Sequence, residues 1–214
     1  MPGGNSIRAV LLDALGTLVE LEPPWLHLAA ELGRDPDERL ERAFRSEMAY
    51  YREHSHEGRD AASLRELRER CARIISDELG QRVSVPQMMS SIRFRAFDDA
   101  APGLAELREF GLRLVCISNW DYTLPEVLAR CGLGAALDGV VTSAAAGARK
   151  PDPAIFERGL SLASAAPEEA VHVGDSQAED VDGARAAGVR ALLIRRDGGG
   201  DIESLTAIRH HLGL

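Results

Sequence analysis

The chain has 214 residues, enough for one large domain or for a core that carries a smaller inserted domain. Its formal net charge is -9 at pH 7, which argues against a general affinity for nucleic-acid backbones or anionic lipid. No apolar stretch approaches the roughly 18 residues of a membrane span, and residues 1–5 lack the basic and apolar regions of a secretory signal. We therefore expect a cytoplasmic protein that binds neither nucleic acid nor membrane, and the sequence leaves its oligomeric state open.

Two residue types are used unusually. Lysine and arginine together number 25, of which only Lys150 is a lysine. Because arginine supplies the ordinary surface charge, the one lysine is expected where a compact ammonium is needed rather than a planar guanidinium.

The three cysteines are widely spaced and form no C-x-x-C pair, which favours free thiols over disulfides or a zinc site.

Five short, mainly apolar runs have the character of buried parallel strands. In chain order they are residues 7–12, 112–117, 139–142, 170–173 and 190–194. Helical stretches alternate with them over residues 104–110, 124–130, 153–162 and 180–187. This alternation predicts an α/β fold with a doubly wound parallel sheet.

The pattern of apolar and charged residues changes between about residues 21 and 95, where no strand is evident. Two long, charged amphipathic segments, 37–53 and 61–79, indicate a helical insert. An insert placed between the first and second strands is expected to lie over the carboxyl ends of the strands. We therefore predict an α/β core of residues 1–20 and 96–214 and a helical cap of residues 21–95. Residues 23–24 and 100–103, rich in proline and glycine, are the expected hinges.

Polar side chains stand where the predicted strands and helices end. In chain order they are Asp13, Ser118, Asn119, Lys150, Asp175 and Asp180. Each could simply cap a turn or a helix. Together they bring a nucleophile, a hydroxyl, a cation and a carboxylate pair to one edge of the sheet, which is where doubly wound folds bind their ligands.

The runs that carry these residues are D-x-x-G-T-L from Asp13, S-N from Ser118, K-P from Lys150 and G-D-S-x-x-x-D from Gly174. This series resembles the motifs of the haloacid dehalogenase (HAD) superfamily. The match spans residues 10–188, and the helical insert stands where that superfamily's first type of cap belongs. The run SNWD, residues 118–121, further resembles the rhythmically-expressed-protein-like branch of subfamily IA. The resemblance implies a HAD-like Rossmannoid core.

The resemblance also implies roles. Asp13 attacks the substrate and Lys150 assists it. The groups expected to hold the substrate are Thr17, Ser118, Asn119 and Lys150. Those expected to bind Mg²⁺ are Asp13, the backbone carbonyl of Leu15, Asp175 and Asp180. Asp180 would either bind the metal directly or contact a residue that does. The metal and Lys150 would relieve repulsion between the carboxylate and a phosphoryl group of a small phosphorylated substrate.

One position departs from the phosphatase pattern. Phosphatases of this superfamily carry a second aspartate two residues after the nucleophile, and here that position is Leu15. A positioned acid or base contributes typically about 10² to 10⁴ in rate, so its loss raises the barrier by roughly 3 to 5 kcal/mol. A phosphatase with a missing acid/base is the leading interpretation, and a non-catalytic phospho-ligand-binding or regulatory protein is the second.

The third interpretation is a 2-haloacid dehalogenase, because halide leaves without protonation and those enzymes also lack the second aspartate. Against it, they usually show S-S-N where this chain has residues 174–176, and a tyrosine where Phe156 stands. A phosphonate hydrolase needs an imine-forming lysine in the cap, and residues 21–95 contain none.

Several other residues have two interpretations. Trp120 could line the cleft or pack beneath the cap. Tyr50, Tyr51 and Arg52 end a predicted cap helix, and they could face the substrate or serve helix packing. His172 alternates within an apolar strand, and we interpret it as a hydrogen-bonded core residue.

Overall fold

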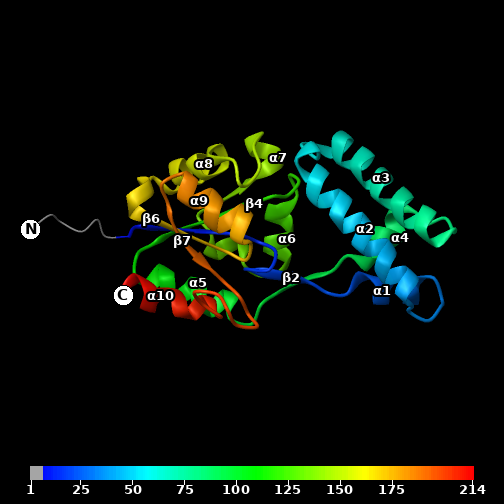
Figure 1. The fold of residues 1–214 in the computed structure, drawn as a ribbon, viewed down its shortest axis with the longest axis horizontal. Coiled ribbons are helices and arrows are strands. Elements are labelled where there is room, and N and C mark those ends of the chain that lie inside the picture. The colour runs from blue at the N-terminus through cyan, green and yellow to red at the C-terminus, as the bar shows by residue number, and fades with distance from the viewer. Residues whose placement is uncertain (1–6) are drawn as a thin grey trace, which may run out of the picture.

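The computed structural model describes residues 7–214, so the first six residues of the predicted core lie outside it. A five-stranded sheet in which every paired strand is parallel forms the centre, in the order β5-β4-β1-β6-β7 (Figure 1). The strands are β1 (Ala9–Leu12), β4 (Arg113–Ser118), β5 (Gly139–Thr142), β6 (Ala170–Gly174) and β7 (Arg190–Leu193). Each predicted strand is present, and the predicted α/β class is confirmed.

The sheet is covered on both faces, because alternate residues of its strands enter two separate apolar clusters. In β1, Val10 and Leu12 pack into one cluster, and Ala9 and Leu11 pack into the other. The first cluster includes residues of α5 (Ala100–Glu109), α6 (Leu124–Arg130) and α10 (Ile208–Leu212). The second includes residues of α8 (Pro153–Ala163) and α9 (Gly183–Ala186).

One expected hinge, residues 100–103, is instead the first turn of α5. Pro102 is the third residue of that helix, where a backbone N–H has no partner within the helix and its absence costs little. Gly103 is required by packing, since a Cβ there would lie 2.9 Å from the Cβ of Leu205. Proline and glycine therefore mark a helix start and a close contact here. The other expected hinge coincides with the start of α1 at Pro24.

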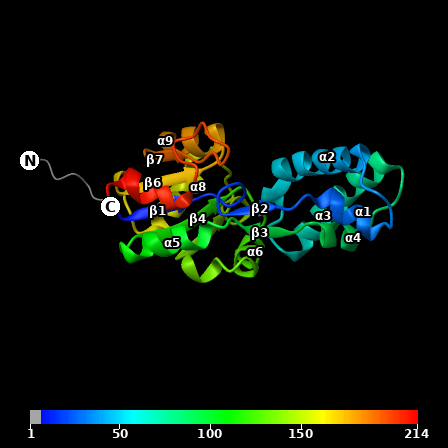
Figure 2. The ribbon, with the colours of Figure 1, turned by 90° about the horizontal axis from the view of Figure 1, so that it is seen from below.

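Four helices form the part of the chain that is expected to be a cap. They are α1 (Pro24–Glu31), α2 (Glu38–His54), α3 (Ala61–Leu79) and α4 (Val85–Ser91). They enclose an apolar cluster of their own, which includes Leu28, Phe44 and Leu67. Figure 2 shows these helices lying beyond one end of the sheet. Asp37 and Asp60 accept hydrogen bonds from the first-turn amides of α2 and α3, which explains where these two helices begin.

An antiparallel two-stranded ribbon joins the helices to the sheet. It consists of β2 (Val19–Leu21) and β3 (Phe94–Ala96). The expectation that residues 21–95 hold no strand is therefore wrong at both ends. Each strand has only three residues, too few to produce a readable alternation. The predicted cap boundaries fall inside the ribbon and stay a prediction.

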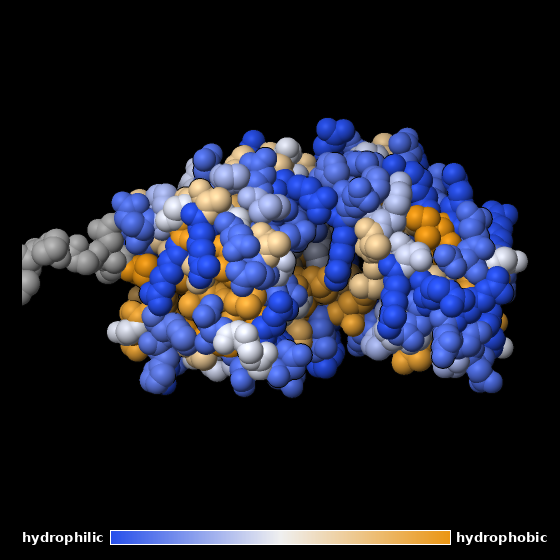
Figure 3. All heavy atoms as spheres, viewed as in Figure 1, coloured by the Kyte–Doolittle hydropathy of each residue, from blue (hydrophilic) through white to orange (hydrophobic). Residues whose placement is uncertain are grey.

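Within residues 7–214, none of the helices is both long enough and apolar enough to cross a membrane. Most of the surface seen in Figure 3 is hydrophilic, and hydrophobic residues also show near the middle, where the sheet-bearing part meets the helices.

Candidate functional site

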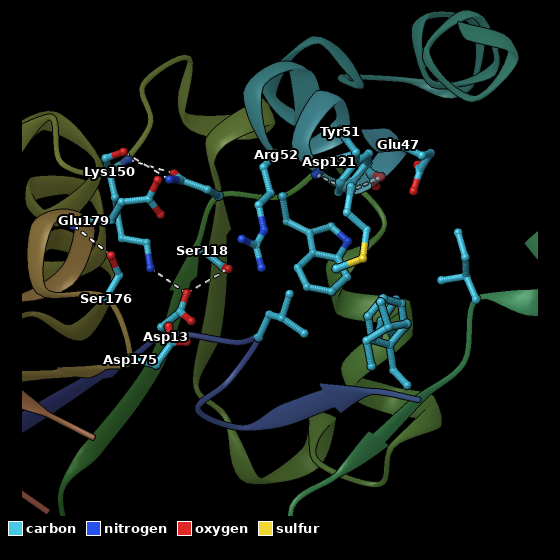
Figure 4. Close-up of a pocket in the computed structure, with 18 of the residues that line it drawn as sticks. Asp13, Glu47, Tyr51, Arg52, Ser118, Asp121, Lys150, Asp175, Ser176 and Glu179 are labelled. Atoms are coloured by element: carbon cyan, nitrogen blue, oxygen red, sulfur yellow. Dashed lines mark hydrogen bonds and ion pairs between the residues drawn. The ribbon is translucent and has the colours of Figure 1, made fainter. Parts of the chain in front are cut away.

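A cavity of about 830 Å³ is lined both by residues at the carboxyl ends of the strands and by residues of α2, α3 and α4. The sheet side supplies Asp13, Ser118, Asn119, Lys150, Asp175 and Asp180. The helical side includes Glu47, Tyr51, Arg52, Arg68 and Met88. The strand-end residues that the sequence singles out therefore line one pocket, together with helical residues (Figure 4).

Asp13 directly follows β1, and its amide donates to the Val173 carbonyl of β6 at 2.9 Å. Its side chain is buried, and its Oδ1 accepts hydrogen bonds from Ser118 Oγ at 2.9 Å and from Lys150 Nζ at 2.5 Å. Burial raises the pKa of Asp13 to about 6, against the lowering effect of Lys150. The negative charges of Asp180 and Asp175 also raise it. Burial is therefore the main cause of the raised pKa of Asp13, and the neighbouring carboxylates add to it.

Lys150 bridges two carboxylates inside the protein. Its Nζ lies 2.5 Å from Asp13 Oδ1 and 2.6 Å from Asp180 Oδ1, and the side chain is only 2 % exposed. Burial alone would lower the pKa of Lys150, but the two carboxylates raise it above its usual value. The lysine is therefore charged, and its ammonium faces the Asp13 carboxylate, the group that would attack a substrate.

Asn119 holds the lysine by its backbone. Its Oδ1 accepts from the Lys150 amide at 2.8 Å, and its Nδ2 donates to the Lys150 carbonyl at 3.0 Å. Both polar ends of the side chain are therefore engaged, although Asn119 lines the pocket as expected. The geometry therefore supports Asn119 as a residue that positions Lys150, whereas the resemblance implies that Asn119 contacts the substrate.

Asp180 is fixed by several partners. Its Oδ2 accepts from the Ser176 amide at 2.9 Å, and its Oδ1 contacts His172 Nε2 at 2.9 Å as well as Lys150. Burial raises the pKa of Asp180, but Lys150 and His172 outweigh it and hold that pKa well below its usual range. His172 is fully buried, so its interpretation as a hydrogen-bonded core residue is confirmed.

The segment that carries Asp180 differs from the helix expected over residues 180–187. A turn of π-helix covers Gln177–Asp182, and α9 follows it. The wide turn lets the Asp180 carboxylate turn back to the Ser176 amide, four residues earlier. Such turns are frequent at functional sites.

Three carboxylates could hold a metal ion. Oxygen atoms of Asp13, Asp175 and Asp180 all lie within 4.8 Å of one another. Gly16 has φ +86°, and a Cβ there would overlap the Asp175 carboxylate, so a glycine is needed beside it. Carboxylate oxygens suit a hard divalent cation such as Mg²⁺. Because the Asp180 carboxylate already has three hydrogen-bond partners, we infer that it positions Lys150 and does not bind the metal directly.

Thr17 does not lie where the resemblance implies. It is fully buried and is not among the residues that line the pocket. Its Oγ1 has no hydrogen-bond partner within residues 7–214, and its carbonyl accepts from Arg196 at 2.6 Å. Direct contact between Thr17 and a substrate therefore has no support in the geometry. Leu15 does line the pocket, and the use of its carbonyl by a metal stays a prediction.

Helix α2 contributes side chains to the opposite wall. Tyr51 and Arg52 line the pocket, as does Trp120, whereas Tyr50 stacks on His54 instead. The Tyr51 hydroxyl donates to Asp121 Oδ2 at 2.7 Å, so this wall is tied to the loop after β4.

The pocket is also lined by residues that the sequence analysis does not single out, among them Glu47 and Asp121. The signal for Glu47 was available, because it falls at the spacing of the buried residues Leu40, Ala43 and Phe44 of the same helix. Asp121 follows the recognised S-N pair, but its partner Tyr51 is 70 residues away in the sequence, and no local pattern reports such a pair.

Comparison with known families agrees with this arrangement. Residues 7–188 match the haloacid dehalogenase-like hydrolase family. The chain belongs to this family. Membership in this family agrees with the strand-end constellation around Asp13.

Curated HAD-like relatives match about half of the chain. The human haloacid dehalogenase-like hydrolase domain-containing protein 3 is 45 % identical over 101 residues, which are 47 % of this chain and 40 % of that protein. Phosphoserine phosphatase from Thermus thermophilus is 41 % identical over 105 residues, 49 % of this chain and 42 % of that protein. The matched segments thus span less than half of these relatives.

The whole HAD fold is matched by solved structures. That of a HAD phosphatase from Thermococcus onnurineus has a TM-score of 0.69 and 26 % identity, and it covers 97 % of this chain and 98 % of that chain. This similarity extends over the helices as well as the sheet.

Proposed function

We propose that this protein is a Mg²⁺-dependent phosphatase that acts in the cytoplasm on a small phosphorylated metabolite through an aspartyl-phosphate intermediate. The observation that carries the proposal is the convergence of Ser118 Oγ and Lys150 Nζ on one oxygen of Asp13. A buried carboxylate so held is aimed into the pocket beside two further carboxylates. The phosphatase names of similar proteins support the same substrate class.

The reaction follows from the positions of these residues. The Asp13 carboxylate attacks phosphorus, the bond from phosphorus to the leaving oxygen breaks, and an acyl phosphate forms on Asp13. Lys150 and Ser118 then bond the transferring group, because they already lie within hydrogen-bond reach of Asp13. Water attacks phosphorus in the second step, which releases phosphate and restores the carboxylate.

The metal and the missing acid shape this reaction. Asp13, Asp175 and the Leu15 carbonyl would hold Mg²⁺, which supplies charge neutralisation on the phosphoryl oxygens. Leu15 has no proton to give, so the leaving oxygen departs as an anion unless solvent protonates it. Substrates with good leaving groups should therefore react faster than alkyl phosphates.

A second candidate function rests on Leu15 itself. A protein that keeps the phosphoryl-holding groups but lacks the acid/base could bind a phospho-ligand without turning it over. The dehalogenase alternative has less support, since Gly174 and Asp175 stand where those enzymes usually show S-S, and Phe156 is a fully buried residue packed edge-on against His172.

Parallel release assays test the proposal. Phosphate release from p-nitrophenyl phosphate and halide release from 2-chloropropionate are measured with and without Mg²⁺, and Asp13→Asn serves as the inactive control. We expect Mg²⁺-dependent phosphate release that the control lacks. Halide release would establish the dehalogenase instead. Tungstate binding without either release would establish the binding protein.

A further inference from the structure

Glu47 lies on the buried face of α2, where the other buried side chains are apolar. The buried residues of α2 are Leu40, Ala43, Phe44 and Glu47, at the spacing of one helix face. Glu47 is only 4 % exposed. A glutamate is rarely so buried unless a partner compensates its charge.

No such partner is present in the described part of the chain. Within residues 7–214, Glu47 forms no ion pair, and only the Cys71 thiol, a weak donor, interacts with its carboxyl. Two arginines close in the sequence to Glu47 and to Cys71 pair elsewhere, Arg45 with Glu41 and Arg70 with Glu57. Arg68 lines the same pocket without pairing with Glu47. Burial accordingly raises the pKa of Glu47 to about 7.

The carboxyl lines the pocket rather than a closed core. Figure 4 shows Glu47 and Asp13 on opposite sides of the pocket, with Arg52 between them. The same pocket is also lined by apolar side chains from α2, α4 and the loop after β4, including Phe44, Met48, Met88 and Trp120. A ligand that reaches from Asp13 to Glu47 would thus have a phosphoryl end, a middle that passes Arg52 and apolar side chains, and a far end that meets a carboxyl.

We propose that Glu47 selects the substrate by accepting a hydrogen bond from a donor, a hydroxyl or an ammonium, at the end of its organic part farthest from the phosphoryl group. The assignment rests on the proposed function for the phosphoryl end at Asp13. A buried acceptor without a strong donor rejects a ligand that leaves it unpaired and favours one that pairs it. Glu47 is therefore a specificity residue and takes no part in the chemical step.

Binding of alkyl phosphonates tests this without any turnover, because their carbon–phosphorus bond is not cleaved by the proposed reaction. Three matched series, ending in methyl, hydroxyl and ammonium groups and each running from two to eight carbons, are titrated by calorimetry in millimolar Mg²⁺. The proteins are wild type, Glu47→Gln, Glu47→Leu and, as a matched control, Glu53→Gln, which alters an exposed glutamate of the same helix. Each protein is checked for folding by circular dichroism.

In wild type and Glu53→Gln, we expect one chain length at which a donor-ended phosphonate binds at least about tenfold more tightly than its methyl counterpart. Glu47→Leu should lose this preference. Glu47→Gln should keep part of a hydroxyl preference and lose an ammonium preference, which tells the two donors apart.

Three outcomes overturn the assignment. If wild type binds all three series with equal affinity at every length, Glu47 selects nothing, and the phosphatase proposal is untouched. If the preference persists in Glu47→Leu, another residue carries it. A wild type that binds no phosphonate of any kind would instead count against the phosphoryl site at Asp13, and the assignment of Glu47 would fall with it.

Discussion

The Asn119 side chain and the Lys150 backbone form a reciprocal pair of hydrogen bonds, 2.8 and 3.0 Å long. This pair joins the end of β4 to the segment before α8, so it fixes where the Lys150 side chain starts. The Lys150 ammonium therefore reaches Asp13 and Asp180 from a backbone that these two hydrogen bonds hold in place.

Asn119→Ala should therefore weaken the site through Lys150. We expect tungstate affinity to fall by about tenfold, because two buried backbone groups lose their partners and the ammonium loses its fixed origin. Asn119→Asp should be intermediate, since it keeps the acceptor for the Lys150 amide and loses the donor to the carbonyl. Calorimetric titration with tungstate measures both variants. Unchanged affinity in Asn119→Ala would show that Lys150 is held by its side-chain contacts alone.

Lys150 itself should not tolerate replacement. Lys150→Ala leaves Asp13 and Asp180 without their common cation, so we expect loss of tungstate binding and a lower free energy of unfolding by about 3 to 5 kcal/mol. Lys150→Arg should restore binding poorly, because a planar fork does not fit between two carboxylates arranged around a point charge. Tungstate titration and urea unfolding measure these effects. An arginine variant that binds as tightly as wild type would contradict this reasoning.

Magnesium should stabilise the protein through Asp175. A ligand at 100 times its dissociation constant adds about 2.7 kcal/mol to the free energy of unfolding, so millimolar Mg²⁺ should raise the melting temperature. Asp175→Ala should abolish the rise, and Asp98→Asn, on the exposed surface, should keep it. Thermal melts followed by circular dichroism provide the measurement. An equal rise in Asp175→Ala would place the metal elsewhere.

Replacing Leu15 should test the missing acid. Wild type should prefer p-nitrophenyl phosphate to alkyl phosphates, and Leu15→Asp should narrow that gap by up to about 10²-fold if the carboxyl reaches the leaving oxygen. Leu15→Asn, of the same size but without a proton to transfer, is the matched control, and Asp13→Asn should abolish the gain. Folding and Mg²⁺ affinity are measured first, because an added anion can repel substrate. A folded, metal-binding Leu15→Asp protein without any gain would mean that more than a proton donor is missing.

Glu47 should make stability depend on pH. Its pKa is about 7 in the folded protein, and the ordinary value for a solvated glutamate is 4.5. The folded state therefore binds more protons than the unfolded state between these values, and stability falls as pH rises through this window. The loss has an upper limit of about 3 kcal/mol. Glu47→Gln should lack it, whereas Glu53→Gln should parallel wild type. Urea unfolding at pH 5, 6, 7 and 8 measures the difference, and parallel curves for wild type and Glu47→Gln would refute the prediction.

Elements with strong local signals could be predicted from the sequence. Helix α3 has the bounds of the predicted segment 61–79, because that segment is long and amphipathic. The parallel strands were found as apolar runs buried on both faces. Strands β2 and β3 were missed, since three residues carry no period and their pairing joins segments more than 70 positions apart.

The site was predictable as a set of residues but less so as a set of contacts. Asp13, Ser118, Lys150 and Asp175 were placed together because strand ends and the start of a helix meet at one edge of the sheet. The turning of Asn119 to the Lys150 backbone and the burial of Thr17 away from the pocket depend on loop paths between strands. Those paths are set by tertiary packing, which no run of sequence encodes locally.

The hydrogen bond from Tyr51 to Asp121 bears on how the pocket exchanges its contents with solvent. It ties α2 to the loop after β4, and the remaining oxygen of Asp121 accepts from the amide and hydroxyl of Thr123. Swinging α2 outward would strip a buried carboxylate of one donor, at a cost of about 1.5 to 3 kcal/mol. Two further hydrogen bonds hold the same end of α2, from the Tyr122 amide to the Gly58 carbonyl at 2.9 Å and from Arg149 to the Glu53 carbonyl at 3.3 Å. A pocket opened by moving α2 would therefore have to break these bonds together and would be a minor population.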